Sequence, residues 1–412
     1  MRVLVVANTF PPAYTGGAEV VNYHACRGLL RRGIDCSLLI VNNRMDSFVD
    51  DWYELDNIPV HRVYFRTPRR RAWTDVFDRR VYRMVLAELH RLQPDVVHIH
   101  NVSGATLAPY VACRTAGIPV VNTLHDLWLL CPNDMLYRSD GSFCDPKQYP
   151  RGCSACFRRY DFWGNIPYRR TVFAALTANV KLFISPGQEV IERHVEAGYA
   201  RQRFRLLRLG FETPVLQEPY SPNVQVIADN VLSERIVVFA GGGIEIKGVS
   251  VLIQALPAML RHVERLKIVV AGRGEPKYLQ QFQHYTPSVQ VLGAVPFNSM
   301  RSLFAAADLT LVPSTCHENS PVVIYESFAA GTPVVGSAFG GMQELIGEGE
   351  TGYCFPVGNA AALAEQVILH FTRPAHERRA MRRRCVAQVR DHLTLDMHLD
   401  GLEQIYRETV SA

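Results

Sequence analysis

Short apolar runs alternate with segments of helical periodicity along almost the whole chain. Residues 3–6 and 96–99 are two such runs, each rich in valine or isoleucine. Near-continuous apolar runs are typical of strands in a parallel sheet that helices cover on both faces. The alternation of these strands with helices therefore predicts an α/β protein built from doubly wound sheets.

The alternation occurs twice, and a proline-containing segment separates the two halves. Prolines at 214, 219 and 222 mark a linker. In the first half we predict strands at 3–7, 36–41, 58–65, 95–100, 118–124, 180–184 and 204–209, with helices at 18–32, 74–92, 105–116, 167–178 and 186–197. In the second half we predict strands at 235–240, 266–271, 289–293, 308–312, 332–335 and 352–355, with helices at 248–262, 276–284, 298–306, 320–329 and from 360 onward.

Length and composition agree with two globular domains. The chain has 412 residues, of which 48% are hydrophobic and 20% charged, enough for two sizeable cores. The first residues enter a strand directly, and no apolar run approaches the roughly 18 residues that cross a bilayer, so we predict a cytoplasmic protein. In that compartment the ten cysteines are expected to be mostly reduced thiols.

Positive charge is concentrated between Arg62 and Arg91. Nine arginines stand there against Asp75, Asp78 and Glu88, a local balance of +6 compared with +5 for the whole chain. This patch is either a solvated helix surface or a surface that meets an anionic membrane or a phosphorylated acceptor. No nucleic-acid-binding motif accompanies it, so we expect no nucleic-acid partner.

Two carboxylates flank a predicted helix start in the segment 314–341. Ser320 is a good N-cap and Pro321 suits the first helical position, which puts Glu318 just before the helix and Glu326 two turns inside it. A helix N-terminus favours an anion such as a diphosphate. The acids either bind hydroxyl groups beside that anion or simply cap the helix and face solvent.

Polar and glycine residues follow several other predicted strands, where open α/β sheets bind ligands. Gly16 and Gly17 open a helix after the first strand, and His125 follows the strand at 118–124. In the second half, Lys247 and Arg273 lie in glycine-rich turns. The loop at Gly16 and Gly17 matches neither the GxGxxG nor the P-loop pattern, so it indicates neither nicotinamide chemistry nor NTP hydrolysis. Each turn taken alone is also compatible with a purely structural role.

An irregular insert at about 127–160 interrupts the first half. Four thiols in this one loop are enough for a structural zinc site, but a single CxxC with two scattered cysteines fits free thiols or a redox pair better. The cysteines concerned are Cys131, Cys144, Cys153 and Cys156, of which only the last two form a CxxC pair.

These motifs, taken in order, resemble those of the family-4 retaining glycosyltransferases. The resemblance covers essentially the whole chain, and the Glu-x7-Glu spacing followed by Ala-Gly-Thr-Pro-Val-Val is its most specific part. The matching motifs are Pro-Pro…Gly-Gly-Ala-Glu at 11–19, His125-Asp126, Lys247-Gly248, Ala-Gly-Arg-Gly at 271–274, and the pair Glu318 and Glu326.

The resemblance implies the GT-B fold and a transfer reaction. Two Rossmann-like domains, 1–214 and 215–392, would face each other across a cleft, and a C-terminal helix at 393–412 would pack back on the first domain. The implied activity is retaining hexosyl transfer from a UDP- or GDP-sugar to a glycan, lipid-linked or small-molecule acceptor, as in polysaccharide biosynthesis. No cofactor is required for catalysis. The alternatives are a GT-B nucleotide-sugar epimerase or hydrolase, or a non-catalytic relative that binds the nucleotide sugar.

The resemblance also assigns roles to individual residues. His125, Lys247 and Glu318 are the implied catalytic residues: His125 contacts the transferring sugar, Lys247 neutralises the diphosphate, and Glu318 organises sugar and phosphate without acting as a nucleophile. Glu326 is implied to bind the ribose hydroxyls. The full donor-binding set is Gly16, Gly17, Gly242, Lys247, Arg273, Asn319, Ser320, Pro321, Val322 and Glu326.

Two positions depart from the family pattern. Gly242 stands where members commonly carry arginine, five or six residues before the lysine, so Lys247 acts alone or with Arg273. Asn319 replaces a common glycine, which either adds a hydrogen bond to the sugar or narrows the pocket.

Overall fold

The structure is a computed structural model that divides into two compact units, each described here by itself. The first unit is Met1–Gly210 together with Leu395–Ala412, and the second is Phe211–Thr394. The described residues are 1–12, 16–66, 76–100, 102–138, 142, 144–156, 166–211 and 235–411. The linker prolines at 214, 219 and 222 lie outside them.

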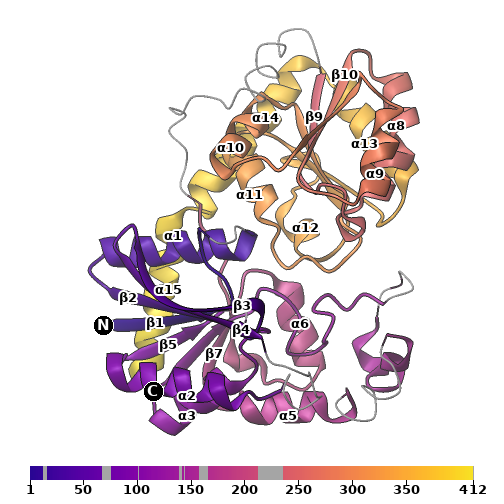
Figure 1. Cartoon of the computed structure of the whole chain (residues 1–412). Helices are drawn as coiled ribbons and strands as arrows, with labels where there is room; N and C mark the ends of the chain where they lie inside the picture. The colour runs from indigo at the N-terminus through magenta and orange to yellow at the C-terminus, as the bar shows by residue number, and fades with distance from the viewer. Residues whose placement is uncertain are drawn as a thin grey trace. The chain divides into compact units, whose positions relative to one another are not determined.

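An eight-stranded sheet forms the centre of the first unit (Figure 1). Its strand order is β3-β4-β2-β1-β5-β6-β7-β8, and every pair is parallel except β3 with β4. The strands are β1 (Arg2–Ala7), β2 (Asp35–Asn42), β3 (Arg44–Leu55), β4 (Ile58–Arg66), β5 (Val96–Ile99), β6 (Val120–Thr123), β7 (Val180–Ser185) and β8 (Phe204–Leu206).

The antiparallel edge strand β3 corrects the prediction of a wholly parallel sheet. Its side chains are all exposed or half-buried, and it carries acidic residues at 46, 50, 51 and 54. A strand at a sheet edge needs no continuous apolar run, so the apolar pattern gave no signal for it.

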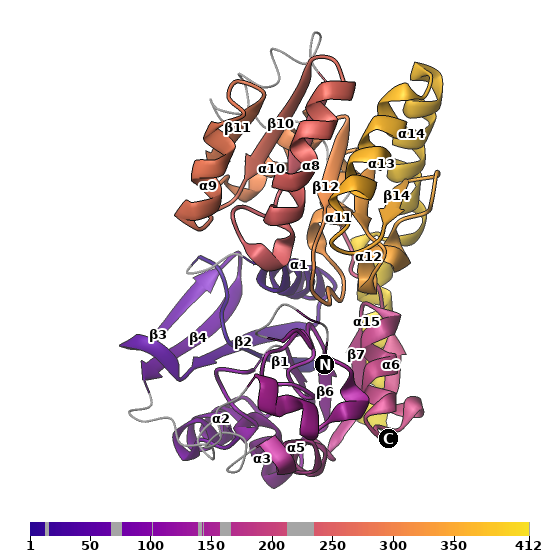
Figure 2. The same cartoon turned by 90° about the vertical axis from the view of Figure 1, so that its right-hand side faces the viewer.

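Helices cover both faces of this sheet. One face packs against α1 (Gly17–Arg31) and α15 (Leu395–Ser411). Figure 1 shows α15 passing behind the strands, and Figure 2 shows it beside β7. The other face packs against α2 (Arg79–Leu92), α3 (Ala108–Ala116), α5 (Arg169–Leu176) and α6 (Gln188–Glu196). Short 3-10 helices lie at η1 (Pro146–Gln148), η2 (Arg151–Ala155), η3 (Ile166–Tyr168) and η4 (Arg201–Arg203).

The second unit has a six-stranded parallel sheet in the order β11-β10-β9-β12-β13-β14. The strands are β9 (Arg235–Phe239), β10 (Leu266–Ala271), β11 (Val289–Gly293), β12 (Leu309–Val312), β13 (Val334–Ser337) and β14 (Gly352–Phe355). Helices α8 (Val249–His262), α9 (Pro276–Gln283) and α13 (Ala360–Thr372) cover one face. On the other side lie α10 (Phe297–Ala306), α11 (Val322–Ala329) and α14 (Ala375–His392), while η5 (Glu245–Lys247) and α12 (Gly340–Leu345) are short.

Helix α11 begins later than the sequence predicts. Pro321 is the residue that precedes the helix rather than its first member, and the helical residues start at Val322. The Ser320 hydroxyl does not cap the helix, because it is hydrogen-bonded to the Tyr325 hydroxyl at 2.6 Å. The predicted end is correct: Gly331 follows the helix with φ +74°.

Each sheet has a switch point beside its first strand. In the first sheet, β1 lies between β2 and β5, so the strand order runs outward in opposite directions from it. In the second sheet, β9 lies between β10 and β12 in the same way. Loops that follow such neighbouring strands diverge at their carboxyl ends and leave room for a ligand. The fold therefore points to the loops after β1 and β5, and to those after β9 and β12.

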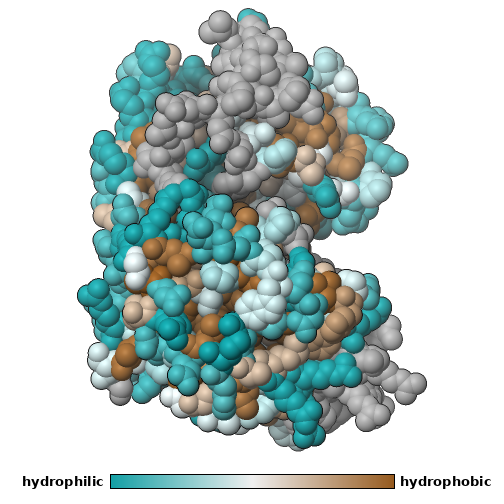
Figure 3. Space-filling view, turned by 60° about the vertical axis from the view of Figure 1, so that its left-hand side comes forward, coloured by the Kyte–Doolittle hydropathy of each residue, from teal (hydrophilic) through white to brown (hydrophobic). Residues whose placement is uncertain are grey.

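The surface gives no sign of a membrane-spanning segment in the part of the chain that is described. No helix there is long and apolar enough to cross a bilayer. On the face drawn in Figure 3, apolar residues form small groups separated by polar ones.

Candidate active site

Two glycine-rich loops interlock at the carboxyl ends of β9 and β10. The Gly243 amide donates to the Arg273 carbonyl at 3.1 Å, and the Glu275 amide donates to the Gly243 carbonyl at 2.9 Å. Gly242 has φ +59°, and a Cβ there would lie 1.9 Å from the Arg273 carbonyl oxygen. This contact excludes any side chain, so the loop cannot hold the arginine that the family pattern places at this position.

Lys247 is delivered to the switch point by the first of these loops. It ends η5 and is followed by Gly248, whose φ is +83° and whose Cβ, if present, would lie 1.9 Å from the Pro313 carbonyl oxygen. The loops after β9 and β12 thus touch through backbone at Gly248, and the Thr315 amide donates to the Ile246 carbonyl at 2.9 Å. Only glycine fits between them.

Lys247 and Glu318 form an ion pair across this switch point. The Lys247 Nζ donates to the Glu318 Oε1 at 2.5 Å, and the Ser314 hydroxyl donates to the same oxygen at 3.0 Å. The Glu318 side chain is 15% exposed and that of Lys247 37%. Both residues predicted from the strand ends therefore lie together, and Ser314, which the sequence analysis did not single out, joins them.

Backbone contacts hold the Glu318 loop in place beside α12. The Gly341 amide donates to the Glu318 carbonyl at 2.8 Å, and a Cβ on Gly341 would lie 1.8 Å from the Asn319 carbonyl oxygen. Asn319 is buried. The short helix α12, which the sequence analysis missed, thus supports the loop that carries the acidic residue.

Glu326 lies half-buried within α11. Burial raises the pKa of Glu326 to about 7, against a smaller lowering by the positive charge of Arg301. Its neighbour Ser327 faces the core, where its hydroxyl donates to the Thr332 carbonyl and is also hydrogen-bonded to the Thr310 hydroxyl. The helix is therefore fixed to the sheet at Ser327, and Glu326 is a carboxylate whose charge changes near neutral pH.

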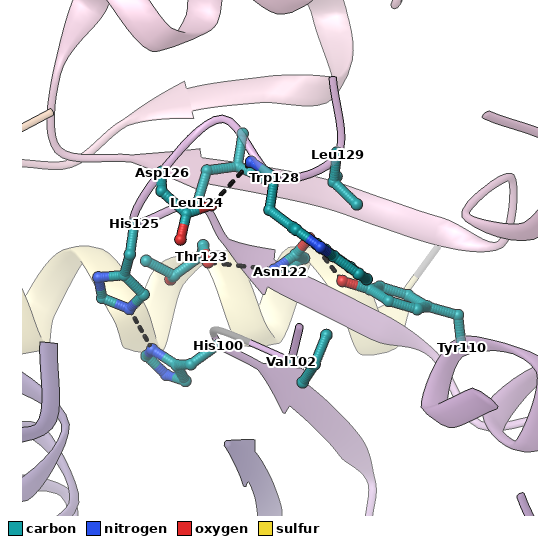
Figure 4. Close-up of a pocket in the computed structure, with 10 residues that line it drawn as sticks. All are labelled: His100, Val102, Tyr110, Asn122, Thr123, Leu124, His125, Asp126, Trp128 and Leu129. Atoms are coloured by element: carbon teal, nitrogen blue, oxygen red, sulfur yellow. Dashed lines mark hydrogen bonds between the residues drawn. The ribbon is translucent and has the colours of Figure 1, made fainter. Parts of the chain in front are cut away.

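In the first unit, His125 follows β6 and lines a small cavity (Figure 4). Its Nε2 is 2.9 Å from the Nδ1 of His100, which directly follows β5. Burial lowers the pKa of His125 to about 4 and that of His100 well below its usual value, with further lowering by neighbouring histidines, so both rings are neutral at pH 7.

The predicted glycine loop after β1 lies partly outside the described residues. Gly16 precedes α1, and its amide donates to the Glu19 carboxylate at 3.1 Å. Glu19 also accepts from the Thr9 hydroxyl at 2.6 Å. Gly17 is the first residue of α1, so the two glycines stand at a helix start as predicted.

Family models match both halves of the chain. The model described as Glycosyltransferase Family 4 matches residues 15–213, and that described as Glycosyl transferases group 1 matches residues 234–372. The chain belongs to the family 4, group 1 glycosyltransferases. Members of this family are glycosyltransferases, and a retaining mechanism fits the family. The epimerase, hydrolase and non-catalytic alternatives are therefore not favoured.

Individual relatives of known sequence are also glycosyltransferases by name. Phosphatidyl-myo-inositol mannosyltransferase of Mycobacterium leprae is 32% identical over 123 residues, which are 30% of this chain and 33% of that protein. A putative teichuronic acid biosynthesis glycosyltransferase of Bacillus subtilis is 26% identical over 396 residues, covering 92% of this chain and 90% of that one. The match thus spans about a third of the first relative and nearly all of the second.

Solved structures share the fold of this glycosyltransferase. Anabaena HepE in complex with UDP has a TM-score of 0.73 and 19% identity, covering 99% of this chain and 100% of its own. Sucrose-phosphate synthase of Thermosynechococcus elongatus has a TM-score of 0.75 and 18% identity, covering 100% and 99%. The predicted GT-B fold class is therefore confirmed.

The described residues of the cysteine-bearing insert do not form a recognisable metal site. No group of three or more His, Cys, Asp or Glu residues there is arranged to hold an ion. Cys153 and Cys156 bracket a single turn, and burial raises the pKa of Cys131 and of Cys153 to about 11, which favours thiols. Residues 139–141, 143 and 157–165 lie outside the described part, and zinc at Cys131, Cys144, Cys153 and Cys156 stays a prediction.

The arginine-rich patch is partly neutralised. Arg62 pairs with Asp51, Arg66 with Asp46, and Arg91 with Glu88. Three further arginines, at 79, 80 and 83, are exposed on α2, whose opposite side is buried through valine and leucine. The arginines at 69, 70 and 71 lie outside the described residues. Among the described residues of this patch, the exposed arginines are thus concentrated on the outer face of α2.

Proposed function

We propose that the chain transfers a hexose from a UDP- or GDP-sugar to a glycan or lipid-linked acceptor, with retention of configuration. The observation that carries this proposal is the Lys247–Glu318 pair at the switch point of the second sheet, directly before α11. HepE was solved with UDP, and the Mycobacterium leprae relative is named for an inositol-lipid acceptor, which supports the choice of donor and acceptor classes.

The chemistry begins with a diphosphate at the start of α11. The segment that leads into this helix is Asn319, Ser320, Pro321 and Val322. The helix dipole favours an anion there. As the bond from sugar to diphosphate breaks, charge grows on the leaving phosphate. Lys247 and the helix start stabilise that charge without moving, which is the largest contribution such a site makes to catalysis.

Glu318 has two roles in this proposal, and neither is that of a nucleophile. Its carboxylate holds Lys247 in position and, with its negative charge, stabilises the positive charge that develops on the sugar in an oxocarbenium-like transition state. His125 binds the transferring sugar. Arg273, on its exposed turn, adds positive charge beside the phosphates. The interlocked loops at Gly242 form the surface against which the nucleotide base lies.

Glu326 binds the ribose hydroxyls, so donor affinity should follow the ionisation of its carboxyl group. The pKa of Glu326 is about 7, and the carboxylate accepts hydroxyl hydrogen bonds better than the neutral acid does. We expect the donor KM to rise as pH falls below about 7, by up to tenfold per pH unit, while Glu326→Ala raises KM at all pH values. Steady-state kinetics between pH 5.5 and 8.5 measure this.

Glu365→Ala, which removes an exposed carboxylate from α13, is the matched control and should leave the pH profile unchanged. A KM that depends on pH equally in the wild type and in Glu326→Ala would refute the ribose role.

The reaction itself is tested with a panel of UDP-, GDP- and ADP-sugars incubated with the pure protein, with and without a lipid extract. We expect nucleotide release from one donor class that depends on the acceptor extract. An altered donor sugar in the absence of any acceptor would contradict transfer and support an epimerase instead.

For a lipid-linked acceptor, we propose that the outer face of α2 contacts an anionic membrane. Basic residues near a membrane surface contribute about 1 kcal/mol each, so Arg79→Glu/Arg83→Glu should weaken binding to vesicles that contain phosphatidylglycerol by at least about tenfold. Co-sedimentation with anionic and with neutral vesicles measures the effect.

The chain offers a matched control for this experiment. Arg379 and Arg383 are also exposed and also four residues apart on one helix, α14. Their replacement by glutamate changes net charge equally and should not alter vesicle binding. Equal losses for the two double variants would show a non-specific charge effect and would contradict a docking role for α2.

A further inference from the structure

His125 is hydrogen-bonded to a second histidine, His100, which the family resemblance did not include. The Nδ1 of His100 and the Nε2 of His125 are 2.9 Å apart, and the two rings are nearly coplanar, with centroids 5.2 Å apart and planes inclined by 26°. Figure 4 shows the rings turned toward each other at one end of the cavity, away from Trp128 and Tyr110. The Nε2 of His125 is thus committed to a protein partner, which leaves Nδ1 as the nitrogen available to a ligand.

A third histidine and a tyrosine lie behind His100. The ring of His98 is 4.0 Å from that of His100, centroid to centroid, and is almost wholly buried. Its Nδ1 is 2.6 Å from the hydroxyl of Tyr406, and its Nε2 is 2.7 Å from the hydroxyl of Thr123. Both ring nitrogens of His98 are therefore occupied, and its plane is fixed between β6 and α15.

Helix α15 supplies a second contact to the same region. His398 on α15 is buried, and because a carbonyl only accepts, its Nδ1 must donate to the Arg208 carbonyl at 2.8 Å. The His398 and Tyr406 side chains fix α15 against the end of β8 and against β5, respectively. Figure 4 shows this helix, in pale yellow, passing behind the histidines.

The hydrogen bond between His100 and His125 determines which nitrogen of His125 carries the proton. Two neutral imidazoles share one proton along the bond. If His125 donates from Nε2, its Nδ1 is an acceptor for a sugar hydroxyl; if it accepts, its Nδ1 is a donor. The proton in this bond therefore ties the tautomer of His125 to that of His100, as hydrogen-bonding partners do for functional histidines generally.

We propose that His100 is a positioning residue that fixes the tautomer and ring orientation of His125, and that Tyr406 of α15 holds His100 in place through His98. The C-terminal helix thus covers the sheet and also helps to position His125 through these side chains. The structural part of the proposal rests on these hydrogen bonds and on the ring contact between His98 and His100. Its effect on turnover rests on the proposed role of His125 in binding the transferring sugar.

The tautomer is measured directly by long-range ¹H–¹⁵N spectra of protein labelled in its histidine rings, with His125 assigned through His125→Gln. In the wild type we expect a single neutral tautomer for His125 at pH 7.5. His100→Ala should give averaged nitrogen shifts from both tautomers, and His100→Asn, which keeps a hydrogen-bonding atom near the Nδ1 position, should restore one. A wild-type His125 signature in His100→Ala would overturn the proposal.

Tyr406→Phe tests the contribution of α15 without removing a ring. It should broaden or shift the His125 signals in the same direction as His100→Ala, but less. Tyr199→Phe is the matched control, because Tyr199 is another buried tyrosine of the same unit that packs near Phe183 and Phe204. Identical His125 spectra in the wild type and Tyr406→Phe would remove α15 from the proposal.

Kinetics separate this proposal from the proposed function. His100→Ala should lower kcat by roughly tenfold to hundredfold with KM changed less, as misplacement of a functional group does. The double variant with His125→Gln should be no slower than His125→Gln alone. If the spectra change as expected while His125→Gln leaves turnover intact, the positioning by His100 holds and the role of His125 in transfer fails.

Discussion

Lys247→Ala is expected to lower kcat/KM for the nucleotide sugar by about 10²- to 10³-fold. The ammonium group sits at the switch point beside Glu318, where the diphosphate of the donor is proposed to bind. Loss of one preorganised donor to a developing negative charge costs about 3–4 kcal/mol in enzymes that stabilise an oxyanion. The loss should be larger than the missing cation alone implies, because the Glu318 carboxylate then repels the diphosphate. Initial rates at varied donor concentration measure both constants.

Lys267→Ala is the control for this variant. Lys267 belongs to the same sheet, near the amino end of β10, and its Nζ donates to the Pro287 carbonyl at 2.8 Å. It should retain wild-type kinetics. A Lys247→Ala protein within threefold of the wild type would exclude the diphosphate role.

Glu318→Gln is expected to lower kcat by about 10²-fold while the donor KM changes by less than about threefold. Glutamine keeps the shape and an oxygen for Ser314, but it removes the negative charge that holds Lys247 and that faces the sugar as positive charge develops. An interaction made mainly in the transition state appears in kcat. A large rise in KM with unchanged kcat would instead assign Glu318 to ground-state binding.

The two residues should also depend on each other. In a double-mutant cycle, Lys247→Ala should cost less in the Glu318→Gln background than in the wild type, because the repulsion between the carboxylate and the diphosphate is gone. Glu365→Gln on α13 serves as the carboxylate control. Strict additivity of the two changes would contradict the functional coupling proposed for the ion pair.

The apolar pattern predicted most of the fold because both sheets are largely parallel and covered on two faces. Buried strands such as β1 and β9 have continuous apolar runs, and α11 ends just before Gly331 as predicted. The edge strand β3 was missed because its half-exposed, acidic sequence lacks such a run. The start of α11 was misplaced because the Ser320 hydroxyl pairs with Tyr325, a contact that propensity does not encode.

The sequence was enough to identify most residues of the candidate site, but not the contacts between them. Lys247 and Glu318 were found from strand ends and spacing, but their direct pairing depends on how two loops meet at Gly248. Likewise, the absence of arginine at Gly242 is explained only by the carbonyl of Arg273 next to it. His100 had a usable signal, since it ends the strand beside the switch point, but its bond to His125 joins residues 25 apart in sequence.

Calorimetric titration of UDP and GDP into the wild type, Lys247→Ala, Glu326→Ala and Lys267→Ala measures whether a nucleotide binds beside Lys247 and Glu318. We expect one binding site per chain for one of the two nucleotides, with affinity reduced at least about tenfold in Lys247→Ala and Glu326→Ala and unchanged in Lys267→Ala. Unaltered binding in both site variants would contradict a nucleotide-sugar site at the Lys247–Glu318 switch point.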